Sequence, residues 1–341
     1  MRKQGVLRSA PNKQDDYVSE GPLPYKNIFN ISEFRKLFNR EDKIMYFLGI
    51  DGGGTKTTCL VTDENLKEIY RTEGCSINFY SEGRETARSN MKSMLLDILK
   101  NTGVSRFDGV CVGSSALFGR ADEKTKADFC DGVFDCDNII MDSDLFIALK
   151  ATEKENAAVI IAGTGSMAAG KNTKGEIITK GGYGYILGDE GSGYRIALDG
   201  IRAAVRSLDG TGEYTLLGDM LLEFSGVKVK DELVDAFYSP EKDRKAIAAF
   251  SRSVSLAAEK GDKTALGILQ NQAELLSETA KALLDIMAEK PYVFLYGGVF
   301  QHSEIFRKHF SSLMKDVCES CELMSREPVF GACIAARESV L

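Results

Sequence analysis

The chain has 341 residues, and its 43 basic and 50 acidic side chains give a formal net charge of −7 at neutral pH. A general nucleic-acid binder needs a basic face, so this balance disfavours that class of protein, and we expect no nucleic-acid partner. A hydrophobic fraction of 43% is ordinary for a globular protein, and the length suffices for two domains of about 100–200 residues each.

Residues 1–42 differ in composition from the rest of the chain. Three of the six prolines, Pro11, Pro22 and Pro24, stand here among many polar residues. This composition predicts a polar N-terminal extension. A second possibility is that translation begins at Met45, immediately before the first predicted strand.

From residue 44 the pattern becomes regular. Short apolar runs predict strands over 44–50, 57–62 and 68–71, and a glycine-rich turn separates the first two. Apolar residues that recur at spacings of three and four predict a helix over 86–100, which Gly103 closes. The first half then continues with a strand over 110–113, a helix over 124–129, a strand over 139–141 and a helix over 144–152.

The second half opens in the same way. Strands are predicted over 157–162, 167–170 and 177–179, again with a glycine-rich turn between the first two, and a long helix over 266–290 precedes a strand over 292–296. The repeated opening indicates an internal duplication. We expect domains over 43–152 and 153–328 around a central cleft, with a C-terminal helix at about 329–341 packing back onto the first domain.

The turn after the first strand is suited to bind phosphate. Glycines lack Cβ, so backbone N–H groups can converge on an anion, and Asp51 can hold Mg²⁺ through water. The spacing is neither that of a P-loop nor that of a Rossmann fingerprint, because a strand follows the glycines. The expected nucleotide-binding residues of this turn are Gly52, Gly53, Gly54, Thr55, Lys56 and Thr57.

Two further turns offer related chemistry. Thr164 and Gly165 lie at the corresponding turn of the second half, and Gly297 and Gly298 follow a strand, where they leave room for adenine. Each turn alone could be an ordinary hairpin, and Lys56 could equally point to solvent.

Three motifs, DGGGTK from Asp51, GTGS from Gly163 and GGYGYILGDEGS from Gly181, resemble those of the BadF/BadG/BcrA/BcrD ATPase family, and within it the N-acetylglucosamine kinase branch. The resemblance runs from about residue 45 to the C-terminus. It implies an α/β protein with a duplicated ribonuclease H-like (actin-like ATPase) fold of two domains around a central cleft. It also implies ATP and Mg²⁺ as cofactors, an amino sugar as substrate and a homodimer.

The resemblance also implies roles for individual residues. Asp144 would be the catalytic base, with Asp142 as the alternative, although an Asp at a helix start is commonly an N-cap. Tyr183 stands where animal kinases of this branch carry tryptophan, and because this chain has no tryptophan, sugar stacking is expected to differ. The expected substrate-binding residues are Asn78, Ser114, Ser115, Asp144, Gly182, Tyr183, Asp189 and Glu190.

The function expected from this resemblance is ATP-dependent phosphorylation of an amino sugar, N-acetylglucosamine first, at its 6-hydroxyl. N-acetylmuramic acid or glucosamine are alternative substrates. An ATPase activator of a 2-hydroxyacyl-CoA dehydratase is a further alternative, although the cysteine context of its iron–sulfur cluster is absent. A non-catalytic ATP-binding switch of the actin kind is disfavoured by Asp189 and Glu190, and a ROK repressor-kinase by its missing zinc motif.

The eight cysteines are expected to be free thiols, because no apolar N-terminal signal sequence stands before them, and we expect a cytoplasmic location. The most apolar stretch, 157–170, is too short to cross a membrane. Cys318 and Cys321 form a CxxC motif, but no second ligand pair stands at the spacing of a zinc site. His302 and His309 are expected on the surface of a single polar helix.

Overall fold

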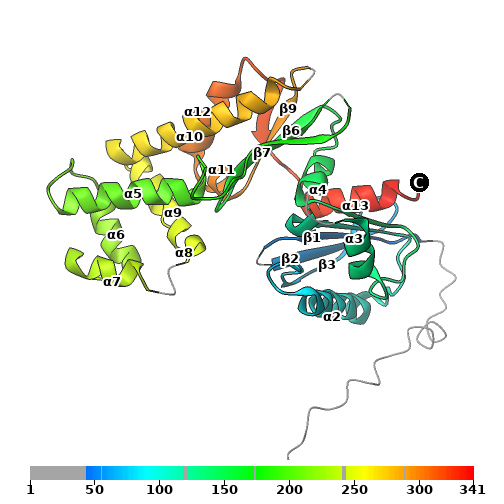
Figure 1. Cartoon of the computed structure of the whole chain (residues 1–341). Coiled ribbons are helices and arrows are strands. Elements are labelled where there is room, and N and C mark those ends of the chain that lie inside the picture. Colours follow the sequence, from blue (N-terminus) through cyan, green and yellow to red (C-terminus); the bar gives the residue numbers. More distant parts are fainter. Residues whose placement is uncertain (1–43, 55, 118–121, 173, 240–242, 288) are drawn as a thin grey trace, which may run out of the picture. The chain divides into compact units, whose positions relative to one another are not determined.

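The computed structural model describes residues 44–54, 56–117, 122–172, 174–239, 243–287 and 289–341 (Figure 1). The first five strands form a mixed sheet in the order β3-β2-β1-β4-β5. Its central strand β1 pairs antiparallel with β2 and parallel with β4. The strands are β1 (Phe47–Gly52), β2 (Lys56–Thr62), β3 (Glu68–Cys75), β4 (Gly109–Ser114) and β5 (Ile139–Asp142).

The second sheet repeats this plan. Read from one edge, its order is β8-β7-β6-β9-β10, and its central strand β6 again pairs antiparallel with the next strand and parallel with β9. The shared order confirms the internal duplication predicted from the sequence. The strands are β6 (Ala157–Ala162), β7 (Ser166–Lys171), β8 (Ile177–Gly181), β9 (Tyr292–Tyr296) and β10 (Ser320–Leu323).

The helices of the first half have the predicted order and differ from the prediction only near their ends. The predicted helix over 86–100 extends at both ends, and it stops where the N–H of Gly103, in the left-handed region, donates to the Leu99 carbonyl. Helix η1 (Ser115–Leu117) directly continues β4. The α-helices are α2 (Arg84–Thr102), α3 (Glu123–Cys130) and α4 (Asp144–Ala151).

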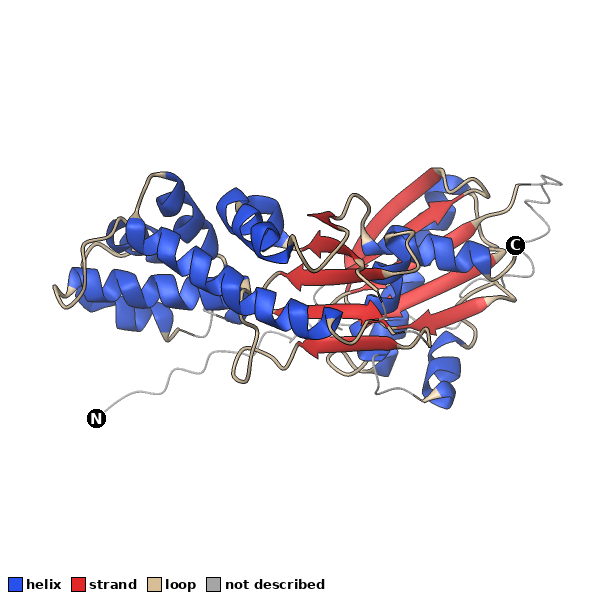
Figure 2. Cartoon of the chain, turned by 90° about the horizontal axis from the view of Figure 1, so that it is seen from above, coloured by secondary structure: helices blue, strands red, loops and turns tan. Residues whose placement is uncertain are grey.

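Along the chain, the described residues between β8 and β9 form helices and no strand. Figure 2 shows a group of helices that lies apart from the strands. The sequence pattern gave no elements between residues 193 and 259. These helices are α5 (Gly193–Leu208), α6 (Leu217–Ser225), η2 (Lys230–Glu232), α7 (Leu233–Phe237), α8 (Arg244–Ala248), α9 (Ser251–Glu259) and α10 (Lys263–Leu284). Along the chain, β9 is followed by α11 (Gly298–His302) and α12 (Glu304–Met314), and β10 is followed by α13 (Pro328–Glu338).

Two predictions about these helices are wrong. The long helix predicted over 266–290 begins three residues earlier, where the Asp262 carboxylate accepts from the Ala265 N–H at 2.9 Å, and it ends at Leu284. His302 and His309 do not share one helix, because α11 ends at His302 and a new helix starts after Ser303. Among the described residues, no helix is long and apolar enough to span a membrane.

Each sheet has its own hydrophobic core. In the first, α2 buries Met91, Met94 and Ile98 together with side chains of β1 and β4. In the second, buried side chains of α5, α9 and α10 share one cluster with those of β6, and Phe300 packs its ring edge to face against Phe306 and Phe310. Burial of such apolar surface is the main force that holds each half together.

The C-terminal helix α13 packs on β1, β4 and α4, all of which belong to the first half of the chain. The packing is close because glycines stand at the contacts. A Cβ at Gly49 would lie 2.5 Å from the Val329 carbonyl oxygen, and a Cβ at Gly331 only 1.9 Å from the Ile147 carbonyl oxygen. At both positions, a larger residue would force the helix away from its support.

We therefore expect Gly331→Ala to destabilise the protein by about 2–3 kcal/mol, because the added methyl group overlaps backbone atoms of α4. Urea unfolding monitored by circular dichroism measures the change. Gly267→Ala is the matched control: this helical glycine is exposed, and no other group lies within 4 Å of the place that the added methyl group would take. There the same change should stabilise by up to about 1 kcal/mol through helix propensity. Equal effects at the two positions would contradict the close packing of α13.

Candidate functional site

Three parallel strands of the first sheet end together, and this places several of the expected site residues side by side. In the register of the sheet, Asp51 of β1 pairs with Gly113 of β4, and Gly113 pairs with Asp142 of β5. One residue further, Gly52 pairs with Ser114. Carboxyl ends of parallel strands are the usual position of ligand sites in α/β proteins.

The geometry distinguishes the two candidate bases. Asp142 already accepts from the Ser143 N–H at 2.6 Å and from its hydroxyl at 3.2 Å. Ser143 is the N-cap of α4, since its Oγ accepts from the Phe146 N–H at 3.1 Å. Asp144 is therefore the first residue of the helix and not its N-cap, and its carboxylate accepts from N–H groups of the first turn. Burial raises the pKa of Asp144 above its ordinary value.

Asp51 is half-buried beside this group. Burial, followed by the negative charges of Asp144 and Glu327, raises the pKa of Asp51 to about 6, and Lys56 lowers it in part. The negative charge of Asp144 thus acts on the Asp51 carboxylate. Glu327, directly before α13, had no signal in the sequence that linked it to this site.

The first glycine turn rests on the segment that follows β3. A Cβ at Gly52 would lie 2.7 Å from the Ile77 side chain. Thr57 is fully buried, and its hydroxyl accepts from the Ile77 N–H at 3.1 Å. Lys56 points to the neighbouring strand, where its ammonium group pairs with Glu73 at 2.6 Å. Gly53 and Gly54 complete the turn, and Thr55 lies outside the described residues.

The expected sugar-side residues of the first half come together. The Asn78 amide donates to the Ser115 hydroxyl at 3.4 Å, and its oxygen accepts from the Tyr80 N–H at 3.0 Å. Ser114 is buried, and its hydroxyl accepts from the Ala116 N–H at 3.3 Å. Ser115 is thus the more accessible of the two serines.

The second glycine turn is held by a buried carboxylate. A Cβ at Gly165 would lie 2.8 Å from the Asp189 carboxylate, which accepts from the N–H groups of Ser166 and Gly184. Asp189 is only 4% exposed and has a φ of 65°, a strained conformation for a residue with a side chain. Burial raises its pKa. Thr164 lies half-exposed at the tip of this turn.

The loop before α5 presents the remaining expected sugar ligands. The Ser166 hydroxyl donates to the Glu190 carbonyl at 2.7 Å, which fixes the backbone of Glu190 against β7. Gly182 has a φ of 75° and lies against Met167. The next residue, Tyr183, is 74% exposed and is free to contact a ligand.

The third turn lies against the second. Gly297 has a φ of 104°, and a Cβ there would lie 2.5 Å from the Ala162 carbonyl oxygen at the end of β6. A small hollow beside it is lined by Gly298, His302 and Arg252 among others. Burial, and then the charges of Asp51 and Glu327, raise the pKa of Tyr296 to about 12.

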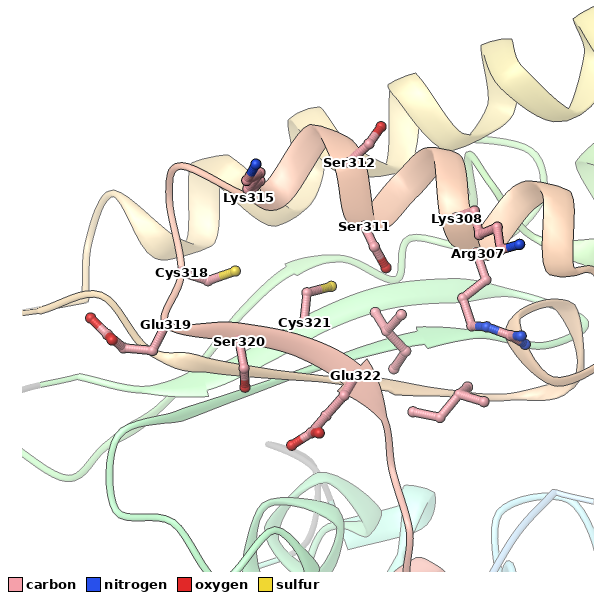
Figure 3. Close-up of a pocket in the computed structure, with 12 residues that line it drawn as sticks. Arg307, Lys308, Ser311, Ser312, Lys315, Cys318, Glu319, Ser320, Cys321 and Glu322 are labelled. Atoms are coloured by element: carbon pink, nitrogen blue, oxygen red, sulfur yellow. The ribbon is translucent and has the colours of Figure 1, made fainter.

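A separate cavity of about 580 Å³ lies between α12 and β10 and shares no residue with this site (Figure 3). Cys318, Cys321 and Ser311 point into it (Figure 3). Burial raises the pKa of Cys321 to about 11, and that of Cys318 is also raised, so both thiols are protonated at neutral pH and weakly reactive. Within the described part of the chain, no three His, Cys, Asp or Glu side chains are grouped to hold a metal ion.

Comparison with known proteins relates this geometry to a family. The model of the BadF/BadG/BcrA/BcrD ATPase family matches residues 48–336. An N-acetylmuramic acid/N-acetylglucosamine kinase of Clostridium acetobutylicum is 30% identical over 300 residues, which cover 86% of this chain and 98% of that protein. An N-acetyl-D-glucosamine kinase of Dictyostelium discoideum is 27% identical over 313 residues, with 86% and 98% covered.

Solved structures have the same fold. A Chromobacterium violaceum protein, proposed to be an N-acetylglucosamine kinase, superposes with a TM-score of 0.69 at 21% identity, covering 86% of this chain and 99% of that one. Together with the repeated strand order, this confirms the duplicated ribonuclease H-like fold that was predicted from the sequence motifs.

We expect Asp51→Asn to stabilise the folded protein at pH 7 by about 1–3 kcal/mol. The folded pKa of Asp51, about 6, lies above its ordinary value of 3.8, so the native chain retains a proton that the unfolded chain loses. Stability therefore falls as pH rises between these two values and stays reduced at pH 7. Asparagine does not titrate, so the variant does not lose this stability as the pH rises. Urea unfolding of both proteins at pH 5 and pH 7.5 measures the difference.

Asp97→Asn is the control with the opposite sign. Hydrogen bonds from Thr72 and Tyr70 lower the pKa of Asp97, so its ionised form stabilises the fold and its loss should destabilise at pH 7. A loss of stability in Asp51→Asn as large as that in Asp97→Asn would contradict the raised pKa of Asp51.

Proposed function

The chain belongs to the BadF/BadG/BcrA/BcrD ATPase family, and from that premise we propose that it is a kinase that transfers the γ-phosphate of ATP to the 6-hydroxyl of N-acetylglucosamine. One observation carries the proposal most directly. Asp144 holds a half-buried carboxylate, with no side-chain partner of its own among the described residues, beside Asp51 at the common end of β1, β4 and β5. A group of this kind can accept a proton from an alcohol.

The nucleotide would be held by the glycine turns. Backbone N–H groups of Gly52, Gly53 and Gly54 in the first turn, and of Thr164 and Gly165 in the second, are the donors that suit phosphate oxygens. Gly297 and Gly298, which follow β9, would leave room for the adenine base because they carry no Cβ. Lys56 is paired with Glu73, so a contact with phosphate would require it to leave this partner.

Mg²⁺ fits the donor set at Asp51. Its carboxylate is half-buried, and the negative charges of Asp144 and Glu327 act on it, so a cation bound there would be attracted by all three groups. A bound Mg²⁺ would neutralise negative charge on the phosphates of ATP. Asp51 would hold the ion through water, as a single carboxylate commonly does for this metal.

Asp144 would act as the general base. It would take the proton of the sugar 6-hydroxyl as the oxygen attacks the γ-phosphate, and the raised pKa of Asp144 brings its basicity closer to that needed at neutral pH. Asp142 suits this role less well, since the Ser143 N–H and hydroxyl already occupy it.

The sugar would lie between Asn78 and Ser115 on one side and the loop of Tyr183, Asp189 and Glu190 on the other. Gly182, which has no side chain, would let this loop approach the ligand. Ser114 would help to position Ser115 through the hydrogen bond that its hydroxyl accepts from the Ala116 N–H. Asp189 already bonds to two N–H groups, so we assign it one sugar hydroxyl in addition to its part in holding the turn. The exposed ring of Tyr183 is available to stack on the sugar.

The names of the two kinases from Clostridium acetobutylicum and Dictyostelium discoideum support an N-acetylated amino sugar. N-acetylmuramic acid and glucosamine are the alternative substrates within this proposal. A homodimer and a cytoplasmic location remain predictions that accompany it.

We expect the purified protein to release ADP in the presence of N-acetylglucosamine, ATP and Mg²⁺, measured with a coupled assay over a panel of amino sugars. The sugar with the highest kcat/KM identifies the substrate, and glucose-type sugars without nitrogen serve as the comparison. Absence of sugar-dependent ADP release across the panel would contradict the kinase proposal. A brown, oxygen-sensitive protein would instead point to the iron–sulfur activators of the same family.

We expect Asp144→Asn to lower kcat by about 100-fold or more, because asparagine cannot accept the proton. Binding of a non-hydrolysable ATP analogue, measured by calorimetry, should stay within a few-fold of the wild type. Asp142→Asn, at the end of β5, is the matched control and should lose much less activity. The reverse ranking of the two variants would move the role of base to Asp142.

A further inference from the structure

Ser76 links two parts of the proposed site that the sequence motifs treat separately. It follows β3 directly and is only 4% exposed. Its hydroxyl donates to the Gly53 carbonyl of the first glycine turn at 3.0 Å and accepts from the Asn78 N–H at 3.1 Å. One small side chain thus bonds both to the turn that would hold phosphate and to the residue that would contact the sugar.

The surroundings make this link rigid. The Ser76 carbonyl accepts from the Asn90 amide of α2 at 2.8 Å. The next residue, Ile77, covers Gly52 with its side chain and donates its N–H to the buried Thr57 hydroxyl. The segment from Ser76 to Asn78 is therefore fixed to the β1–β2 hairpin at several points, and none of these contacts involves a charged group that water would screen.

Asn78 extends the link to η1, which directly follows β4, through its bond to the Ser115 hydroxyl. The path therefore runs from the glycine turn through Ser76 to Asn78 and on to Ser115, and each step is a hydrogen bond. A shift of the Gly53 carbonyl, as when phosphate oxygens bind the adjacent N–H groups, would be passed to the Asn78 backbone by the one hydroxyl that they share.

We propose that Ser76 is a positioning residue that couples nucleotide binding at the first glycine turn to sugar binding at Asn78. The inference rests on the proposed kinase function. Ser76 does not itself contact either substrate. Its role is to hold the Gly53 carbonyl and the Asn78 N–H at one fixed separation, so that the turn and the amide side chain reach their binding positions together.

The experiment compares Ser76→Ala with the wild type. The methyl group leaves the Gly53 carbonyl and the Asn78 N–H without their shared partner, and we expect kcat/KM for the sugar to fall about tenfold, the size of one lost hydrogen bond of this kind. Calorimetry with the sugar alone, the ATP analogue AMP-PNP alone, and both together measures the coupling. The factor by which AMP-PNP strengthens sugar binding should fall by about threefold or more in the variant.

Two controls separate positioning from general loss of structure. Ser277→Ala removes an equally buried serine hydroxyl, which bonds to the Glu274 carbonyl in α10, and should leave the coupling factor unchanged. Because Ser76 acts through Asn78, the double variant Ser76→Ala/Asn78→Ala should bind sugar no more weakly than Asn78→Ala alone.

The outcomes distinguish this inference from the function on which it rests. If the wild type releases ADP with sugar but Ser76→Ala keeps the wild-type coupling factor, or if the losses in the double variant are additive, the positioning role is overturned and the kinase proposal stands. If the wild type shows no sugar-dependent turnover and no sugar binding, both are overturned.

Discussion

The approach of helix α4 to the ends of β1 and β4 determines where the acidic groups of the site lie. Gly113 of β4 makes this approach possible, because a Cβ there would lie 2.4 Å from the Ile147 side chain of α4. With the helix seated on the strand, its first residue Asp144 comes close enough to Asp51 to raise the pKa of that carboxyl. A larger residue in place of Gly113 would move Asp144 away from the end of β1. The position of Asp144 relative to β1 thus depends on one buried glycine and one buried isoleucine.

The two halves share a strand order but hold their glycine turns by different means. In the first, neutral groups do this work: the hydroxyls of Ser76 and Thr57 bond to the backbone, and Ile77 covers Gly52. In the second, the Asp189 carboxylate lies against Gly165, and the Gly193 N–H at the start of α5 donates to the Gly163 carbonyl at 2.7 Å. A duplicated fold therefore supplies the position of the turn, whereas the side chains that stabilise it are particular to each half.

Sequence patterns predicted the strands better than the helices or the contacts of the site. The bounds of β6 and β9 were predicted as observed, because each is an apolar run that ends in glycine. The end of α10 was predicted wrongly, because it depends on tertiary packing. Met287, which follows the helix, packs against Gly170 of β7. In the site, the spacing of residues along the sequence could not show that Ser143 is the N-cap of α4. Nor could it show that Lys56 forms an ion pair with Glu73 on the adjacent strand. Such choices depend on neighbours that are distant in sequence.

The fold raises the pKa of some carboxylates and lowers that of others. Asp122 accepts from the N–H and hydroxyl of Thr125 and Asp97 from the hydroxyls of Thr72 and Tyr70, and the pKa of each is lowered, so their ionised forms support the structure. For Asp51, Asp144 and Asp189 burial prevails and the pKa is raised. A fold selected for stability alone would have little reason to keep three acids in this condition, one of them with a strained backbone. All three are residues to which the proposed function assigns binding or proton transfer, and in that proposal a cation or a ligand hydroxyl would offset their cost in stability.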